Sequence, residues 1–427
     1  MKIIKNIILM GLFLTPLILS AQDFKDGDFS ISAQIRARGE YRNGSLTPRE
    51  EGDKAATFIN NRTRLTMDYK RSNLEFKLAG QHVGVWGQQP QINKKSDFIL
   101  NEAWAKINFN EGFFAQIGRQ VLSYDDERIL GGLDWNVAGR YHDLLKLGYA
   151  NDVNTLHLSL AFNQNDEKVH GGNYYAAGAQ PYKNMQTLWY HYGNNKRPFG
   201  ISLLVMNLGR EIGIPEKPKD AYMQTFGTYL TYKKDILDLS GAVYYQTGKN
   251  EFDRSVSAYM ANVFAKANLS NQWAVGVGSD YLSGSNSSEG KYKAFDPLYG
   301  THHKFYGTMD YFYASSFVSG FNPGLWDNQL GLYYKTSPKV DMSLNYHYFM
   351  TAKELEIENA KLDKGLGSEL DFQINWSIMP DVKLMAGYSV MFGTKTMDAV
   401  KGGNHKRWQD WGWVSINITP NLFSTKR

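Results

Sequence analysis

Hydrophobic and polar residues alternate one by one along much of the chain. In the first such stretch, apolar side chains occupy the odd positions Phe29, Ile31, Ala33, Ile35, Ala37 and Tyr41, and polar side chains occupy the even positions between them. Only a β-strand turns a period of two into one apolar and one polar face. The alternation recurs in segments 64–70, 74–78, 102–109, 156–162, 340–348, 366–376 and 414–418. The pattern predicts an all-β protein built from amphipathic strands.

The polar faces of these strands meet either bulk water, as in a soluble sandwich, or the lumen of a membrane barrel. The strands approach the length of about 9–11 residues that tilted strands need to cross the hydrocarbon. Aromatic residues gather at strand ends, as in interfacial girdles: Tyr41, Tyr69, Phe109, Tyr149, Phe162, Tyr232, Trp376 and Phe392. Tight connections (70–73, 110–112) alternate with long polar ones (43–57, 84–98, 163–184, 283–304, 394–407). These observations favour the barrel.

We therefore expect a transmembrane antiparallel up-and-down β-barrel of about 18 strands. The pattern offers about nineteen candidate strands, but both ends of such a barrel normally lie on the periplasmic side, so the number should be even. The weakest candidate is segment 305–312, which we exclude. No linker or repeat divides the chain, so residues 22–427 are expected to form one barrel domain.

The first 21 residues resemble a secretory signal peptide. Lys2 and Lys5 precede an apolar stretch from Ile7 to Leu19, and Ser20-Ala21 supplies small residues before the expected cleavage site. No other run of 18 or more apolar residues exists, so a spanning structure has to be a closed barrel. The expected location is the outer membrane of a Gram-negative cell.

Composition excludes several classes of protein. The 427 residues include no cysteine, which rules out disulfides, thiolate metal sites and a lipoprotein anchor. A mean hydropathy of −0.45 argues against a bundle of membrane helices. The net charge of +5 falls to +3 when Lys2 and Lys5 are removed, so nucleic acid is not an expected partner.

Arginine is concentrated early in the chain, because ten of its 15 copies lie between residues 36 and 140. Arg36 and Arg38 lie on the polar face of the first strand, and Arg62 and Arg64 on that of the second. Guanidinium groups bind carboxylates with a two-pronged fork, and a ladder of them biases a pore toward anions. A competing interpretation is that inward charges of both signs pair across strands and brace the wall.

Glu102 and Lys106 occupy polar positions on a later strand and are also lumen-lining candidates, and mixed signs would suit a neutral sugar or a zwitterion. We predict no catalytic residue, cofactor or metal. His142, His302 and His303 lack acidic or histidine partners at a ligand spacing. Asp125-Asp126-Glu127 lacks the glycine-punctuated spacing of a calcium loop, and no Gly-x-Ser-x-Gly elbow is present.

One stretch is recognisable. Residues 118–135, GRQVLSYDDERILGGLDW, together with Arg140-Tyr141-His142-Asp143, resemble the motif of the alginate-export family of outer-membrane channels. Asn61-Arg62-Thr63-Arg64-Leu65 and segment 295–307 are similar to two further stretches of that family. The sequence departs from the pattern at Asp125, where the family usually has glycine, and at His142, which separates the aromatic residue from the aspartate.

The resemblance implies an 18-stranded barrel that passes a polysaccharide, such as a polyuronate, through an arginine-rich lumen. Arg62, Arg64, Arg119, Arg128 and Arg140 match the family's motif positions. They would either line the path of the substrate or hold the connection 123–140 inside the barrel.

The leading hypothesis is an outer-membrane channel for passive passage of an anionic oligo- or polysaccharide, such as an alginate-like polyuronate, or of another anionic solute. The alternatives are a general porin, a structural or adhesive barrel, and an outer-membrane enzyme, whose active Ser and His would have to face lipid. The expected partners are the anionic solute, outer-membrane lipid, and periplasmic proteins of secretion or degradation.

Overall fold

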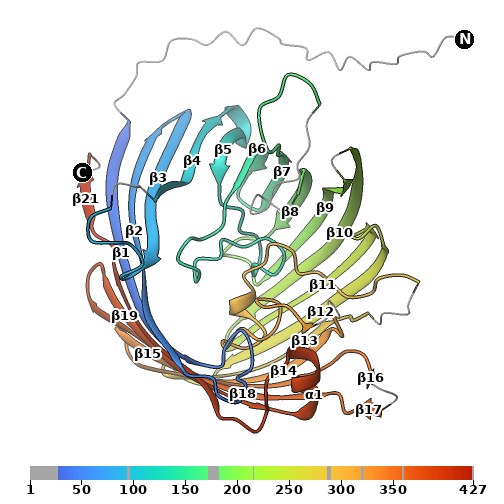
Figure 1. The fold of residues 1–427 in the computed structure, drawn as a ribbon. Helices are drawn as coiled ribbons and strands as arrows, with labels where there is room; N and C mark the ends of the chain where they lie inside the picture. Colours follow the sequence, from blue (N-terminus) through green and yellow to red (C-terminus); the bar gives the residue numbers. More distant parts are fainter. Residues whose placement is uncertain are drawn as a thin grey trace, which may run out of the picture.

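The computed structural model describes residues 27–93, 97–171, 182–214, 216–285, 290–318, 322–357 and 360–425; the predicted signal peptide lies outside them. Within these ranges, eighteen long strands form a closed antiparallel barrel (Figure 1). They are β1 (Asp28–Asn43), β2 (Ala56–Arg71), β3 (Leu74–Val85), β4 (Phe98–Asn108), β5 (Phe113–Gln120), β6 (His142–Ala150), β7 (Asn154–Phe162), β8 (Asn184–Tyr192), β9 (Phe199–Ile214), β10 (Lys217–Lys234), β11 (Leu237–Lys249), β12 (Ser255–Asn268), β13 (Trp273–Leu282), β14 (Leu325–Ser337), β15 (Val340–Met350), β18 (Gly365–Met379), β19 (Val382–Gly393) and β20 (Gln409–Ile418). Strand β1 pairs with β2 on one side and with β20 on the other, which closes the barrel. The predicted fold class is confirmed.

A few small elements complete the described part of the chain. Strand β21 (Asn421–Ser424) continues β20 along β1, and β16 (Leu355–Ile357) pairs with β17 (Ala360–Leu362) in a small hairpin. Two short 3₁₀ turns span Asn110–Gly112 and His302–Lys304, and helix α1 spans Lys395–Lys401. Among the described residues, no helix has the length and apolar character needed to span a bilayer.

The strands separate apolar and polar side chains as the alternation predicts. Ile35 and Leu65 are exposed on the outer face, whereas Arg36 and Arg62 on the same two strands are buried on the lumen side. Six of the eight end-of-strand aromatic residues are exposed on the outer face: Tyr41, Phe109, Phe162, Tyr232, Trp376 and Phe392. An apolar outer band with aromatic edges suits a barrel in contact with hydrocarbon.

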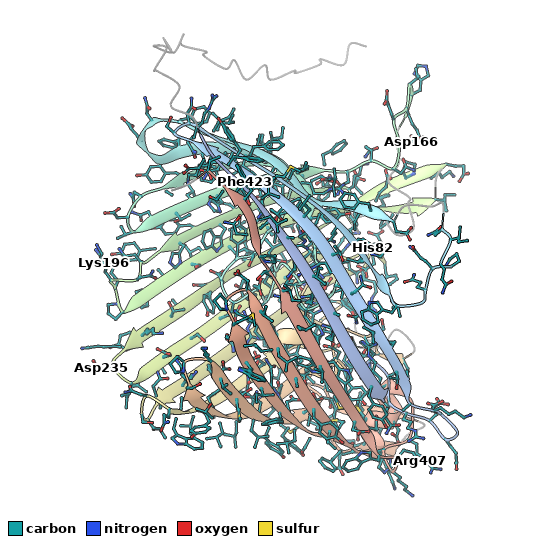
Figure 2. The ribbon with its side chains drawn as sticks, turned by 90° about the vertical axis from the view of Figure 1, so that its left-hand side faces the viewer. His82, Asp166, Lys196, Asp235, Arg407 and Phe423 are labelled. Carbon is teal, nitrogen blue, oxygen red and sulfur yellow. The ribbon has the colours of Figure 1, made fainter. Side chains whose placement is uncertain are left out.

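The two rims of the barrel differ in their connections. Short turns such as 72–73, 151–153 and 338–339 join strands at one rim, where the described chain ends also lie, and long loops join them at the other. Figure 2 shows the turn residues Lys196 and Asp235 at one rim and the loop residues Asp166 and Arg407 at the other. Two connections at the long-loop rim are short: β10 begins at Lys217 soon after β9 ends at Ile214, and only residues 250–254 separate β11 from β12. The expected rhythm of short and long connections is confirmed.

Two of the long loops enter the barrel. Loop 121–141 follows β5, and loop 283–324, described over 283–285, 290–318 and 322–324, follows β13. Figure 1 draws the first loop in teal and the described parts of the second in gold to orange, inside the ring of strands. The second loop is longer than the expected 283–304 because segment 305–312, the excluded strand candidate, belongs to it. Its aromatic side chains Tyr306, Tyr311 and Phe312 are buried. Phe312 packs against Phe349 of β15, and Tyr306 packs against Tyr313 of the same loop.

Candidate functional site

The inward faces of β1 and β2 carry four arginines, Arg36, Arg38, Arg62 and Arg64, which we call the arginine row. Residues two apart on a strand share a face, so the row follows directly from the sequence. In the pairing register, Arg36 lies opposite Arg62. Like charges directly opposite each other repel, so this arrangement requires a compensating group.

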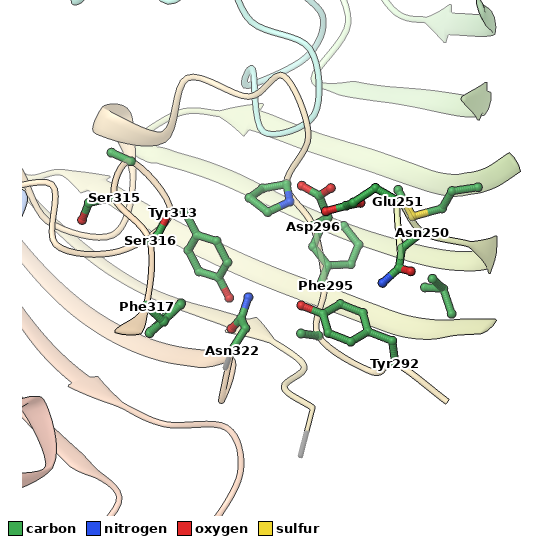
Figure 3. Close-up of a pocket in the computed structure, with 15 residues that line it drawn as sticks. Asn250, Glu251, Tyr292, Phe295, Asp296, Tyr313, Ser315, Ser316, Phe317 and Asn322 are labelled. Carbon is green, nitrogen blue, oxygen red and sulfur yellow. The ribbon is translucent and has the colours of Figure 1, made fainter. Parts of the chain in front are cut away.

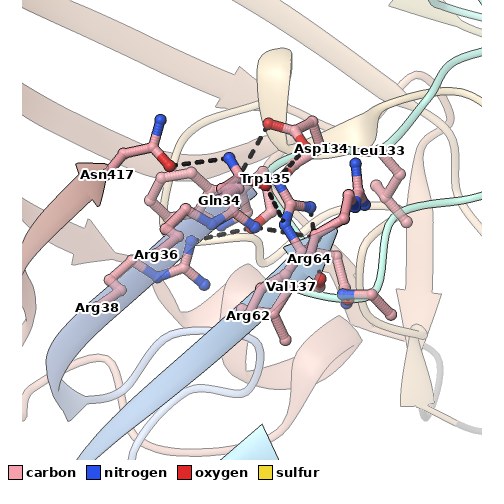
Figure 4. A network of polar contacts seen from close by, with 12 residues as sticks. Gln34, Arg36, Arg38, Arg62, Arg64, Leu133, Asp134, Trp135, Val137 and Asn417 are labelled. Atoms are coloured by element: carbon pink, nitrogen blue, oxygen red, sulfur yellow. Dashed lines mark hydrogen bonds and ion pairs between the residues drawn. The ribbon is translucent and has the colours of Figure 1, made fainter. Parts of the chain in front are cut away.

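Loop 121–141 lies on the arginine row and supplies that group (Figure 4). Five consecutive main-chain carbonyl oxygens of the loop, those of residues 134 to 138, accept hydrogen bonds from the wall. Arg36 donates to the oxygens of residues 134 (Nη1, 2.7 Å) and 136 (Nη2, 3.3 Å), and Arg38 Nη1 donates to that of residue 135 (2.9 Å). Arg62 Nη1 donates to the oxygen of residue 137 (3.4 Å). The oxygen of residue 138 accepts from both Gln81 Nε2 (2.7 Å) and Asn101 Nδ2 (3.2 Å). Asn136 O also accepts a main-chain hydrogen bond from Gly139 N within the loop, at 3.1 Å. For the other four carbonyl oxygens, the wall supplies the donors that buried main-chain groups require.

The Asp134 carboxylate lies between the two opposed arginines. Its Oδ1 accepts a hydrogen bond from Arg62 Nη2 at 2.7 Å, and its Oδ2 accepts one from Arg36 Nη1 at 3.2 Å. The side chain of Asp134 is 74% exposed, whereas those of Arg36 and Arg62 are 11% and 1% exposed. The carboxylate therefore faces the open lumen and covers the guanidinium groups behind it.

The other two members of the row have different partners. Arg38 Nε pairs with Glu40 Oε1 at 2.9 Å, and its guanidinium carbon lies 3.8 Å from the centre of the Trp135 ring. Arg64 donates to Gln81 Oε1 through Nε and Nη2, at 2.9 and 2.6 Å, and so orients the amide that holds the loop. All four arginines of the row are engaged, and three of them contact the loop directly.

Arg128 and Arg140 lie within the loop and join it to its surroundings. Arg128 is buried, donates to Asp126 Oδ2 at 2.7 Å, forms an ion pair with Asp280 of β13, and lies over the Phe305 ring. Burial disfavours its charge, but Asp280 and Asp126 outweigh that effect and raise the pKa of Arg128. Arg140 donates to the carbonyl oxygens of Tyr299 and Gly300, so it ties the two inner loops together.

The inner loops also form a short main-chain ladder. Tyr299 N donates to Ile129 O at 3.0 Å, and Gly131 N donates to Tyr299 O at 2.9 Å. Gly300 is packed so closely that a Cβ there would lie 2.2 Å from the Arg128 carbonyl oxygen. The two loops therefore cross the lumen as one packed unit.

Glu102 and Lys106 line the lumen side of β4 and pair with neighbours on β3. Lys77 Nζ lies 3.1 Å from Glu102 Oε1, and Lys106 Nζ lies 3.4 Å from Glu75 Oε1. These contacts match the bracing interpretation, because each charge finds its opposite across adjacent strands.

Arg119 departs from its expected place in the lumen. It shares the outer face of β5 with Ile117, which is exposed, and it forms a two-pronged ion pair with Asp143 of β6, with Nε–Oδ1 at 2.9 Å and Nη2–Oδ2 at 3.0 Å. Its guanidinium also lies over the ring of Tyr141. Arg119 therefore braces the outside of the barrel near the loop rim and does not line the path of a solute.

A cluster of carboxylates on β13 to β18 was missed by the sequence reasoning. Asp280, Asp327, Glu369 and Asp371 are buried on the lumen side. His347 Nδ1 contacts Asp327 Oδ2 at 2.9 Å, and Thr308 of the second inner loop donates to Asp371. His347, Glu369 and Asp371 occupy polar positions of the predicted alternation, but the sequence analysis assigned no face to Asp280 or Asp327. Nothing in the sequence indicated that the inner loops bind these carboxylates.

Near the start of the first inner loop, Asp125 is held in a poorly hydrated position. Trp189 Nε1 donates to both of its carboxylate oxygens at 3.2 Å, and the Trp189 ring stacks on Tyr124. Burial raises the pKa of Asp125 to about 6. The loop therefore contains one carboxyl group that titrates close to neutral pH.

A cavity of about 360 Å³ opens beside the second inner loop (Figure 3). Its lining combines rings with polar groups, among them Tyr292, Tyr313, Phe317, Glu251 and Asp296. Arg210 lies 3.3 Å from a carboxylate oxygen of Glu251 and 3.3 Å from one of Asp296. The cavity belongs to the loop side of the barrel, because its lining includes Asn250 and Glu251 of the connection between β11 and β12.

The histidines considered as metal ligands serve in packing. His142 Nδ1 lies 2.8 Å from Tyr182 Oη, and His303 Nδ1 lies 2.9 Å from Asp310 Oδ2 while its ring stacks on Trp135. His302 Nδ1 lies 2.9 Å from Tyr313 O, and burial lowers the pKa of His302. Across the described ranges, no group of three or more His, Cys, Asp or Glu side chains is arranged to hold a metal ion.

Comparisons with known proteins identify the fold. The chain resembles Pseudomonas aeruginosa OccK9 (OpdG) with a TM-score of 0.63 and 13% identity, over 92% of this chain and 98% of that one. Acinetobacter baumannii OccAB1 gives a TM-score of 0.64 at 11% identity, over 92% and 97% of the two chains. Pseudomonas aeruginosa OpdK, solved with vanillate, gives a TM-score of 0.61 at 8% identity, over 92% and 99%.

No family model and no curated protein matches the chain. The resemblance to the alginate-export family therefore gains no support from these comparisons. At identities of 8–13% the solved structures show a shared architecture. The chain has the 18-stranded barrel fold of these Occ and Opd proteins, almost from end to end.

Proposed function

We propose that the protein is an outer-membrane channel through which small anionic solutes diffuse passively. The proposal is supported by the closed barrel, its apolar outer band and its likeness to the Occ and Opd structures, of which one OpdK structure carries vanillate, a small aromatic carboxylate. Diffusion needs no cofactor or nucleotide.

The observation that carries the proposal is the surplus of positive charge where the inner loop meets the wall. The arginine row brings four guanidinium groups to this point, and within the described chain Glu40 and Asp134 are the carboxylates in contact with them. Fixed charge at a narrow point biases the ions that pass, and an excess of arginine favours anions. The cations lie close behind the lumen surface, so they act through their field even where their hydrogen bonds are taken by the loop.

The narrower version of the proposal, passage of an alginate-like polyuronate or another anionic polysaccharide, rests on the motif resemblance alone. Two loops packed across the lumen favour a small solute over a polymer chain. The general porin is the closest alternative; it would show weak ionic preference and no block by a particular solute. Periplasmic partners for secretion or degradation stay a prediction that genomic neighbours would inform.

An outer-membrane enzyme has less support. His157 and His347 lie on inward faces, where they contact Tyr124 and Asp327, so neither faces lipid as a barrel lipase would require. One of the solved structures that share the fold, that of Pseudomonas aeruginosa OpdK, is described as an outer-membrane protein.

Planar bilayers containing the purified protein test the proposal. We expect a reversal potential that indicates anion preference in a KCl gradient, and concentration-dependent block of current by vanillate. Uronate oligomers form a second arm, in which block at lower concentration than vanillate would favour the polysaccharide version. A preference for cations, without block by either compound, would contradict the proposal. If the purified protein conducts no current, the result would favour the hypothesis of a structural barrel.

The matched variants are Arg62→Ala with Arg64→Ala, compared with Arg119→Ala. The first pair removes two positive charges from the lumen side and should reduce anion preference. Arg119→Ala removes a positive charge from the outer face and should leave the preference unchanged. Equal effects of the two changes would argue against the arginine row as its source.

A further inference from the structure

Asp134 occupies the position that the carboxylate of a solute would take between Arg36 and Arg62. Its two oxygens each accept a hydrogen bond from a different guanidinium group, at 2.7 and 3.2 Å. Its side chain is 74% exposed to the lumen. Packing does not require a charged group this exposed, because the carboxylate has its charged partners, Arg36 and Arg62, only on the side of the barrel wall.

The loop does not depend on this carboxylate for its position. Carbonyl oxygens of residues 134 to 138 are held by Arg36, Arg38, Arg62, Gln81 and Asn101 through bonds that do not involve the Asp134 side chain. Arg140 and the ladder around Tyr299 add contacts to the second inner loop. Removing the charge of Asp134 should therefore leave the loop in place.

We propose that Asp134 is a resident carboxylate that occupies the Arg36–Arg62 pair, competes there with small carboxylate solutes, and so sets the anion affinity of the channel. The inference rests on the proposed function, which it deepens by naming the residue that limits selectivity. An incoming carboxylate meets a partly neutralised pair of arginines and must displace Asp134 or bind beside it. Weak, displaceable binding of this kind suits conduction, which requires that a solute leave as readily as it enters.

Asp134→Asn is the direct test, because the amide oxygen can still accept the Arg62 hydrogen bond while the negative charge disappears. One unit charge a few ångströms from the path changes the partition of an ion about three- to fivefold in water-like surroundings. Because the lost charge favours the anion and disfavours the cation, the permeability ratio of anion to cation, taken from reversal potentials in KCl gradients, should rise by about one order of magnitude. The benzoate concentration that blocks half of the current depends on the anion alone and should fall about three- to fivefold. Raising the salt concentration should shrink both effects.

Three further variants fix the interpretation. Asp143→Asn is the matched control, since it removes the same charge from an ion pair with Arg119 on the outer face, and it should leave the ratio unchanged. Asp134→Ser removes the charge with a different side chain, so it replaces Asp134→Asn if that variant fails to assemble. Asp134→Glu keeps the charge and should keep the ratio of the unmodified protein.

The possible outcomes separate this inference from the proposed function. If the unmodified channel prefers anions and neither neutral variant raises that preference, the inference fails and the proposed function stands. If the unmodified channel prefers cations, the proposed function fails, and a shift toward anions in the neutral variants still supports the role of Asp134. Equal shifts in Asp134→Asn and Asp143→Asn would overturn the inference, because the effect would then come from charge anywhere on the barrel.

Discussion

Replacing Arg128 with alanine is expected to lower the free energy of unfolding by about 3–5 kcal/mol. The guanidinium of Arg128 is 4% exposed and lies between Asp126 and Asp280, and the side chain of Asp280 is fully buried. Arg128→Ala would leave the Asp280 charge in the interior without its cation, and would also remove the stacking on Phe305. The cost arises mainly from this stranded carboxylate, since burying an unpaired charge is strongly unfavourable.

A double-mutant cycle tests this origin. Asp280→Ala alone should cost less than Arg128→Ala, because Arg128 keeps its ion pair with Asp126. Arg128→Ala with Asp280→Ala should cost much less than the sum of the two single changes, because the double variant leaves no unpaired Asp280 charge. Arg197→Ala is the control: Arg197 is an exposed turn residue whose Nη1 donates to Tyr192 Oη, and its replacement should change stability by no more than about 0.5 kcal/mol.

The assay is urea unfolding of the protein in lipid vesicles, followed by tryptophan fluorescence and by gel mobility without heating. The reasoning would be refuted by a cost of Arg128→Ala below about 1 kcal/mol, or by single changes whose costs simply add in the double variant. Either result would mean that Asp280 is hydrated or neutral in the folded barrel, so that no charge is stranded.

Two other predictions concern the inner loops. Gly300→Ala would place a Cβ 2.2 Å from the Arg128 carbonyl oxygen and should lower the free energy of unfolding by about 1–3 kcal/mol in the same assay. Gly290→Ala is the control and should cost far less, because a Cβ at Gly290 meets nothing within 4 Å. Equal costs of the two changes would contradict the packing of the two loops. The pKa of Asp125 is raised from its ordinary value of 3.8 to about 6 when the first loop is docked, so the docked state binds the proton more tightly than the undocked state. The docked loop should therefore lose stability as pH rises from about 4 to 6, and its stability should then stay level. Fluorescence from Trp189, taken as the difference from Trp189→Phe, should follow this titration, and Asp125→Asn should abolish it; a change centred outside that window would count against the assignment.

Much of the fold could be predicted from the sequence because its main signal is local. The alternation of Ile35 with Arg36, or of Leu65 with Arg64, has the period of a strand, and each strand of a closed barrel needs one face for lipid and one for the lumen. The same parity placed Glu102 and Lys106 inside. For Arg119 the only expectation came from the motif resemblance, which pointed to the lumen, whereas the structure places Arg119 on the outer face of β5 with the exposed Ile117.

Other parts of the structure carry no local signal. Segment 305–312 has the aromatic content of a strand but belongs to a loop, because its rings are buried by packing inside the lumen and not by pairing. Helix α1 has seven residues, too few for a helical period to appear, and it is held by a Thr394 cap and by the burial of Met397 and Val400. Such short helices form through tertiary packing.

The sequence by itself determined that arginines from two adjacent strands would meet inside a barrel, since register and alternation are properties of neighbouring residues. Only the tertiary structure decided what those arginines bind. Asp134 is separated from Arg36 by 98 positions and from Arg62 by 72, and nothing in the spacing of the chain indicates that the loop would turn inward and lay five carbonyl oxygens and a carboxylate on the row. Hydrogen bonds and ion pairs of this kind depend on where a closed wall brings distant segments together, and that closure is a property of the whole barrel.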